Sequence, residues 1–162
     1  MNLPGGRRAI VAIVPVALIA GLAVGYLQIV HTGTTPPVPD PAPGQHGPML
    51  ALDSRVINLH PGGAYTYAKI AVTLELRPDS ASFYALTGEA RATAEQAADA
   101  AYTDDVAILL DTLGQVVAGH TSNDLVSGAG REALKTELLA AMRQALGQRT
   151  VLSLYFTDFV MQ

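Results

Sequence analysis

The sequence predicts an α+β protein in which a single membrane-spanning helix precedes a small domain made of an antiparallel sheet packed by two helices. Three observations carry this prediction: a long apolar run near the start, segments of alternating apolar and polar residues, and two stretches with helical three- and four-residue spacing. We expect four parts, namely a cytoplasmic tail (residues 1–8), the transmembrane helix (9–30), a proline-rich linker (31–48) and an extracytoplasmic domain (49–162).

The apolar run from Ala9 to Val30 holds no charged residue. As a helix it spans roughly 33 Å, enough to cross a hydrocarbon core of about 30 Å. Arg7 and Arg8 precede it and no other Lys or Arg follows before Arg55, so the positive-inside rule places the N-terminus inside the cell. A cleaved signal peptide is the alternative, but the run is longer than the usual apolar region and no small-x-small cleavage site follows it.

Small residues recur along one side of this predicted membrane helix, at Ala17, Gly21 and Gly25. Four-residue spacing of small side chains lets two helix backbones approach closely in lipid. We therefore expect these three positions to pack against another helix, although glycine is also common in membrane helices that make no such contact.

The linker and the composition restrict the possible functions. Six prolines lie in residues 31–48 and fix the backbone there, which predicts a semi-rigid spacer. Residues 49–162 carry a net charge of −5, which disfavours nucleic acid and anionic lipid headgroups as partners. The chain has no Cys, so disulfides, thiolate catalysis and Cys-ligated zinc are excluded.

The domain is expected to begin with a β-hairpin. A first strand over Met49–Leu59 is followed by the turn sequence HPGG at residues 60–63 and by an alternating strand over Ala64–Arg77. The apolar side of this second strand is expected to face the core, and its polar side is expected to be solvated. The core side comprises Ala68, Ile70, Val72, Leu74 and Leu76, and the solvated side comprises Tyr65, Tyr67, Lys69, Thr73, Glu75 and Arg77.

Helical spacing replaces the alternation from about Ala90. It predicts one amphipathic helix that ends at Gly119, with an alanine-rich first half packed closely on a neighbour and Asp99, Asp104 and Asp111 outward. A second helix is predicted over residues 130–146, with Ser127 as its N-cap and Gly147 as its stop. Its buried face is expected to hold Leu134, Leu138, Ala141, Met142 and Ala145.

The chain closes with a third predicted strand, VLSLYFTDFVMQ, over residues 151–162. Leu152, Leu154, Phe156 and Val160 would lie on one face, opposite Val151, Tyr155 and Phe159. Because both faces are apolar, we expect this strand to be central in the sheet or covered on both sides.

No pattern of catalytic or ligand-binding residues stands out. The four histidines, His31, His46, His60 and His120, lack metal-ligand spacing, and Asp104 and Asp105 would diverge on a helix rather than converge on a substrate. Residues 128–130 read GAG before a helix but lack the lysine of a phosphate loop. We therefore predict no catalytic, cofactor-binding or metal-binding residue, no cofactor and no enzymatic activity.

Several segments resemble FliL, the family of flagellar basal-body-associated membrane proteins. The ending YFTDFVMQ resembles the family's closing strand, which marks Tyr155, Phe156, Thr157, Asp158, Phe159 and Gln162 as structural motif residues. VINL at 56–59 and YAKIAVTLEL at 67–76 resemble its opening strands. Thr121 to Leu125, Gly130 and the Leu134 and Leu138 helix resemble its middle motif, although Gly128 and Ala129 stand where the family often has Pro-Glu.

The resemblance implies a small domain similar to the stomatin and prohibitin-like (SPFH) fold, which assembles into rings. It also implies an inner-membrane, single-pass location at the flagellar basal body, beside the motor stator, with a role in flagellar rotation, chemotaxis, swimming and swarming. Two other classes remain open: a membrane-tethered ligand-binding sensor, which needs a deep polar pocket, and an anchored hydrolase, which needs a converging nucleophile and base.

Overall fold

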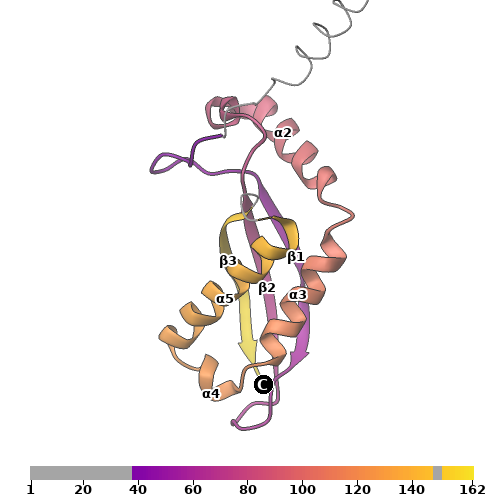
Figure 1. The fold of residues 1–162 in the computed structure, drawn as a ribbon, viewed down its shortest axis with the longest axis vertical. Coiled ribbons are helices and arrows are strands. Elements are labelled where there is room, and N and C mark those ends of the chain that lie inside the picture. Colours follow the sequence, from indigo (N-terminus) through magenta and orange to yellow (C-terminus); the bar gives the residue numbers. More distant parts are fainter. Residues whose placement is uncertain (1–37, 148–150) are drawn as a thin grey trace, which may run out of the picture. The chain divides into compact units, whose positions relative to one another are not determined.

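The computed structural model describes residues 38–147 and 151–162, which form one compact unit. Two strands come first in this part of the chain, the helices follow, and a third strand comes last (Figure 1). The elements are β1 (Met49–Asn58), β2 (Tyr67–Leu76), the 3₁₀ helix η1 (Ala81–Ala85), α2 (Gly88–Ala101), α3 (Val106–Ala118), α4 (Ser122–Leu125), α5 (Gly128–Leu146) and β3 (Val151–Met161).

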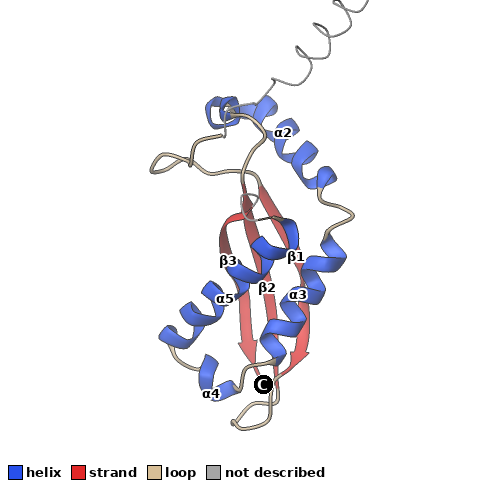
Figure 2. Ribbon diagram, in the orientation of Figure 1, coloured by secondary structure: helices blue, strands red, loops and turns tan. Residues whose placement is uncertain are grey.

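The three strands form an antiparallel sheet in the order β1-β2-β3, with α3 and α5 on one face of it (Figure 2). The predicted α+β class and the predicted hairpin of the first two strands are therefore confirmed. The predicted membrane helix lies outside the described residues. Among the residues that the structure does describe, no helix is both long and apolar enough to cross a bilayer.

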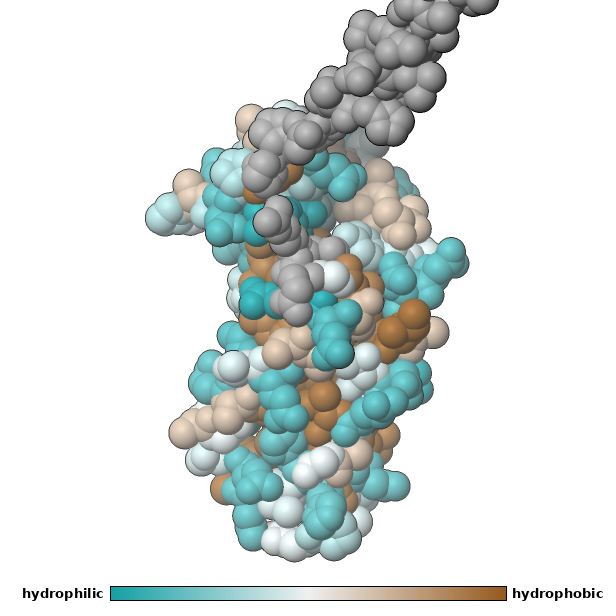
Figure 3. Space-filling model, in the orientation of Figure 1, coloured by the Kyte–Doolittle hydropathy of each residue, from teal (hydrophilic) through white to brown (hydrophobic). Residues whose placement is uncertain are grey.

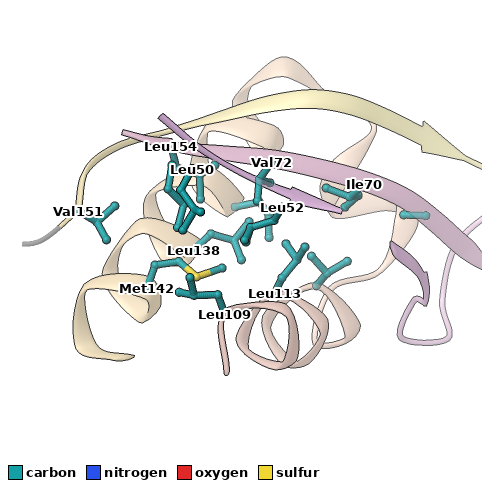
Figure 4. Packing of buried hydrophobic residues seen from close by; sticks show 14 of the residues in the cluster. Leu50, Leu52, Ile70, Val72, Leu109, Leu113, Leu138, Met142, Val151 and Leu154 are labelled. Carbon is teal, nitrogen blue, oxygen red and sulfur yellow. The ribbon is translucent and has the colours of Figure 1, made fainter. Parts of the chain in front are cut away.

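The core lies between the sheet and the two covering helices (Figure 4). The predicted core side of β2 is fully buried, as are Leu109 and Leu113 of α3 and Leu134, Leu138 and Met142 of α5. The opposite face of the sheet is open to solvent, since Val56, Lys69 and Val160 lie side by side across the three strands and all three are exposed. Around these three residues the sheet is thus buried on one face only.

The closing strand differs from the prediction, because β3 is an edge strand and β2 is the central one. The register of β3 against β2 shifts twice, once at Leu152 and once at Thr157. Each shift adds one residue to β3 and reverses the alternation beyond it. The residues that face the core side of β2 are therefore Val151, Leu154, Phe156, Phe159 and Met161.

These bulges explain why both faces of the closing strand look apolar in the sequence. The prediction placed Phe156 and Phe159 on opposite faces, but both lie on the core side, where their rings meet edge to face at 5.2 Å between centroids. Both rings are only partly buried, at the margin of the core. They therefore contribute less to the core than a fully buried phenylalanine would.

The single helix predicted from Ala90 to Gly119 is two helices, α2 and α3, separated by a turn at residues 102–105. This turn contains Thr103, Asp104 and Asp105, residue types that favour turns and caps over helix interiors. Gly119 follows the last turn of α3, as predicted. The alanine-rich half was expected to pack on a neighbour, but α2 has no buried residue and extends beyond the end of the sheet in Figure 1.

The second predicted helix is confirmed as α5, including both of its ends. The Ser127 side chain accepts a hydrogen bond from the backbone N–H of Gly130, which satisfies one of the free donors of the first turn. Gly147 follows the last turn with a φ of 92°, a conformation that glycine adopts without strain. Of the predicted buried face, Ala145 is exposed and Ala141 is partly buried.

Candidate functional site at the attachment end of the domain

The second half of the predicted linker folds against the domain instead of standing away from it. The carbonyl of Pro48 accepts a 2.8 Å hydrogen bond from the backbone N–H of Leu76, and both Gly47 and Pro48 are buried. A Cβ at Gly47 would lie 2.0 Å from the Leu76 carbonyl oxygen, so only glycine fits there. We call residues 38–48 the strap, because this segment leads into β1 and is held by side chains of the domain. The end of the domain that the strap contacts is called the attachment end.

Glu75 holds the end of the strap from within the sheet. It was expected on the solvated face of β2, but it is only 4% exposed. One carboxylate oxygen accepts the Gly47 backbone N–H at 3.0 Å, and the other accepts the hydroxyl of Tyr155 at 2.7 Å. The hydrogen bond to Glu75 is also the largest cause that raises the pKa of Tyr155. A buried carboxylate needs such partners, so this contact joins the strap, β2 and β3.

Two arginines hold the rest of the strap. Arg77 donates to the Val38 carbonyl at 2.6 Å and forms an ion pair with Asp40. Arg91, near the start of α2, donates to the His46 carbonyl at 2.9 Å and to Glu95 at 2.7 Å. Its guanidinium group also lies 4.0 Å from the centre of the Phe83 ring, within cation–π range. Arg91 therefore joins three elements: the strap, η1 and α2.

A hollow of about 500 Å³ lies between η1, the end of β2 and α2. Most of its lining side chains are apolar, and α2 contributes its small residues. These are Ala94, Ala97, Ala98 and Ala101, which the prediction had assigned to a packed helix face. Arg77 and Asp79, which follow β2 in the chain, also line the hollow. The alanine face of α2 therefore borders an open hollow in the described structure.

A second cluster of contacts lies at the other end of the sheet. The turn between β1 and β2 rests on the corner between α3 and α4, where Ser122 Oγ accepts the backbone N–H of Tyr65 at 3.1 Å. Asn123 donates to the Gly62 carbonyl at 2.8 Å. A Cβ at Gly63 would lie 1.9 Å from Ser122 Oγ, so the glycine of this turn is required by the close approach.

The same corner contains a reciprocal helix cap. The Thr121 hydroxyl and the Asp124 carboxylate each accept the other residue's backbone N–H. The Thr121 hydroxyl also donates to this carboxylate, and these bonds lower the pKa of Asp124. A Cβ at Gly130 would lie 1.7 Å from the Asp124 carbonyl oxygen, so the start of α5 is pressed against this cap.

The sequence model of the family described as flagellar basal body-associated protein FliL matches residues 49–162. The chain belongs to the FliL family. It is also similar to the flagellar protein FliL of Aquifex aeolicus (strain VF5), with 30% identity over 125 residues that cover 76% of this chain and 67% of the relative.

The residues that resemble the FliL closing strand have structural contacts along β3. Tyr155 binds Glu75, Phe156 and Phe159 contact each other, and Thr157 lies at the second bulge. Asp158 forms an ion pair of 2.9 Å with Lys69 of β2. Gln162 exchanges backbone hydrogen bonds of 2.9 Å and 3.0 Å with Tyr67. These contacts hold β3 on the edge of the sheet.

The middle motif of the FliL family coincides with the corner described above. Thr121 and Asp124 form the cap, and Gly130 lies in close contact with it. The leucines of the motif are fully buried, namely Leu125, Leu134 and Leu138. Where the family often has Pro-Glu, Gly128 and Ala129 form the first turn of α5 and both are exposed.

Sequence reasoning missed the residues that bind the strap. Glu75 occupies a polar position of an alternating strand, where a solvated carboxylate is the ordinary case. Its partners Gly47 and Tyr155 lie far away in sequence, so no local pattern signals the contact. The predicted helix-packing residues Ala17, Gly21 and Gly25 lie outside the described residues. Within the described part, no cluster of three or more His, Asp or Glu side chains could hold a metal ion.

Proposed function

We propose that this protein is a non-enzymatic scaffold of the flagellar basal body that supports the motor stator and so promotes flagellar rotation, swimming and swarming. Its membership of the FliL family is the observation that carries the proposal. In this proposal residues 9–30 anchor the chain in the inner membrane with the N-terminus inside, the strap connects the anchor to the domain, and the domain, of SPFH-like fold, lies outside the cytoplasm.

The contacts of the described residues support a mechanical role. The carboxylate buried at the attachment end, that of Glu75, binds other parts of the protein, namely Gly47 and Tyr155. Hydrogen bonds to charged groups at the strap would transmit load between the anchor and the sheet. We further propose that the protein forms a ring, in which the anchors pack through Ala17, Gly21 and Gly25.

The test is motility in a strain that lacks the gene and is complemented with variants of the full-length protein. Deletion should reduce swimming under viscous load and swarming on soft agar. His60→Ala and His120→Ala should restore both, because a scaffold needs no proton-transfer group. Normal motility of the deletion strain under load would contradict the proposed function. Loss of motility with either histidine variant, while the protein remains folded and membrane-inserted, would favour an enzyme.

The ligand-binding sensor remains the alternative function. It calls for a deep pocket lined by polar groups that converge on a ligand. The hollow beside α2 is lined mainly by apolar side chains, and its Arg77 is engaged with the strap. This lining favours contact with a protein surface over recognition of a small polar molecule.

A further inference from the structure

α2 is a helix whose stability does not come from burial. It has 14 residues, seven of them alanine, and none is buried. Alanine has the highest helix propensity, but an isolated helix of about 12–15 residues is only marginally stable in water. Arg91 attaches the start of α2 to the strap and to η1. The rest of the helix is exposed or partly exposed, along the side of the hollow.

The net negative charge of the domain lies on α2, α3 and the turn between them. Residues 88–118 carry six acidic side chains and one arginine, a net charge of −5, which equals that of residues 49–162. Asp79 lines the hollow, and Asp104 and Asp105 follow Tyr102, another lining residue, at the corner between α2 and α3. Within the described residues, none of these three aspartates takes part in an ion pair.

An exposed small-residue helix beside an apolar hollow, with uncompensated acidic charge, fits one kind of partner. Alanines on one helix allow a second helix to approach closely, toward the lower end of the usual interaxial distance of about 8–10 Å. An amphipathic helix commonly binds by laying its apolar face in such a groove. Unpaired carboxylates at the margin would attract a cationic partner and orient it.

We propose that the hollow along α2 is a docking site for a basic amphipathic helix of another protein. This inference rests on the proposed scaffold function and assigns one face of the domain to partner binding. Leu86 and the alanines of α2, which line the hollow and are exposed or partly exposed, would contact the apolar side of the incoming helix, while Asp79, Asp104 and Asp105 would face its lysines or arginines. Because α2 is already helical, docking would order few additional residues.

A second copy of this chain fits the site less well. The helix of the described part with most basic residues is α5, which carries Arg131, Lys135 and Arg143. Its apolar face, Leu134, Leu138 and Met142, is fully buried in its own core, so it has no apolar side to offer. Figure 3 shows one face of the molecule, on which hydrophobic residues lie in small patches among polar ones.

The first arm of the test measures binding of a synthetic probe by the full-length protein in detergent. The probe is an 18-residue helical peptide with lysines on one side and alanine and leucine on the other. Ala98→Trp should fill the hollow and weaken binding at least tenfold, whereas the matched variant Ala100→Trp, outside the lining of the hollow, should bind as the wild type. Asp79→Lys combined with Asp104→Lys should also weaken binding, and should favour a peptide with glutamates in place of the lysines.

Equal binding by the Ala98→Trp and Ala100→Trp variants, or indifference to the charge reversal, would overturn the proposal. The proposal would also be overturned if the probe does not bind while copies of the protein crosslink to one another through a photoreactive residue at position 98. That result would favour a second copy of the chain at this site. Because α2 has no buried residue, and Asp79 and Asp104 are exposed, none of these substitutions removes core packing, and thermal unfolding of each variant should match that of the wild type.

The second arm separates this proposal from the proposed function. In the complemented deletion strain, Ala98→Trp should reduce swimming under load toward the level of the deletion, and Ala100→Trp should not. If deletion impairs motility but Ala98→Trp restores it fully, the scaffold function stands and the docking site is wrong. If deletion has no effect on motility, the scaffold function itself fails.

Discussion

α2 and α3 look like one helix in the sequence, yet they are stabilised in different ways. α3 inserts Leu109, Leu113 and Val117 into the core, where all three are fully buried. α2 buries no side chain and is held at its start by Arg91, whose side chain donates to the His46 carbonyl of the strap and to Glu95. One half of the pattern therefore belongs to the core, and the other half belongs to the surface and the attachment end.

The difference shows that helical periodicity in a sequence identifies the small or apolar face of a helix, but does not identify what packs against that face. Both halves repeat small or apolar residues at three- and four-residue steps, but α2 extends beyond the end of the sheet (Figure 1) and buries none of its residues. Alanine removes little apolar area from water, so its recurrence is compatible with an exposed helix. Leucine and valine on α3 require burial to contribute to stability. Residue size within the repeat thus separates the two halves.

The largest expected effect is in α3. Leu113→Ala should lower the free energy of unfolding by about 2–5 kcal/mol, because the side chain is fully buried between α3 and the sheet and its removal leaves a cavity. Chemical denaturation of the full-length protein in detergent measures this loss. Ile108→Ala on the same helix is the control, since Ile108 is 53% exposed and its truncation should cost less than about 1 kcal/mol. Equal losses from the two variants would contradict the assigned packing.

An intermediate effect is expected at Arg91, and it should be local. Arg91→Ala removes charge-assisted bonds to His46 and Glu95 together with the contact to the Phe83 ring. Hydrogen bonds to charged groups contribute about 1.5–3 kcal/mol each, so amides of α2 and the strap should exchange with solvent at least tenfold faster.

Hydrogen exchange read by mass spectrometry distinguishes this local opening from global loss. Amides of α3 should keep the protection of the wild type, and Gln96→Ala, at an exposed position of α2, should leave all rates unchanged. Faster exchange in α3 as well would mean that α2 contributes to the core, and would remove the contrast between the two helices.

The sequence predicted most of the fold where local patterns match local structure. The alternation in β2 located its core face residue by residue, and the caps of α5 at Ser127 and Gly147 followed from residue type. The resemblance to FliL, carried mainly by the YFTDFVMQ ending, was confirmed by the family match over residues 49–162.

What local patterns missed depends on contacts between distant segments. The bulge at Thr157 reverses the faces of β3, and it is visible only in the pairing with β2. The burial of Glu75 depends on Gly47 and on Tyr155, which lies 80 residues away in the sequence. The anchor residues lie outside the described residues, so the predicted helix packing stays a prediction.

The smallest expected effect is at the cap formed by Thr121 and Asp124, which begins α4 directly after α3. The start of α2 has no such cap, because the Thr87 side chain makes no capping hydrogen bond. Hydrogen bonds from Thr121 lower the pKa of Asp124 in the folded protein. A lowered carboxyl pKa contributes stability that is present above the ordinary pKa of an aspartate, near 3.8, and is lost as the pH falls through the folded value. Asp124→Asn should therefore flatten the decline in stability below about pH 4.

Thermal unfolding between pH 2 and pH 7 measures this slope. Asp99→Asn is the control, because Asp99 is exposed and its side chain forms no ion pair within the described residues. If both variants follow the wild-type curve on acidification, the cap contributes nothing measurable, and the end of α3 is held by Leu125 and the neighbouring core alone. If only Asp124→Asn departs from the wild-type curve, the two halves of the predicted helix differ in the capping hydrogen bonds next to them as well as in their packing.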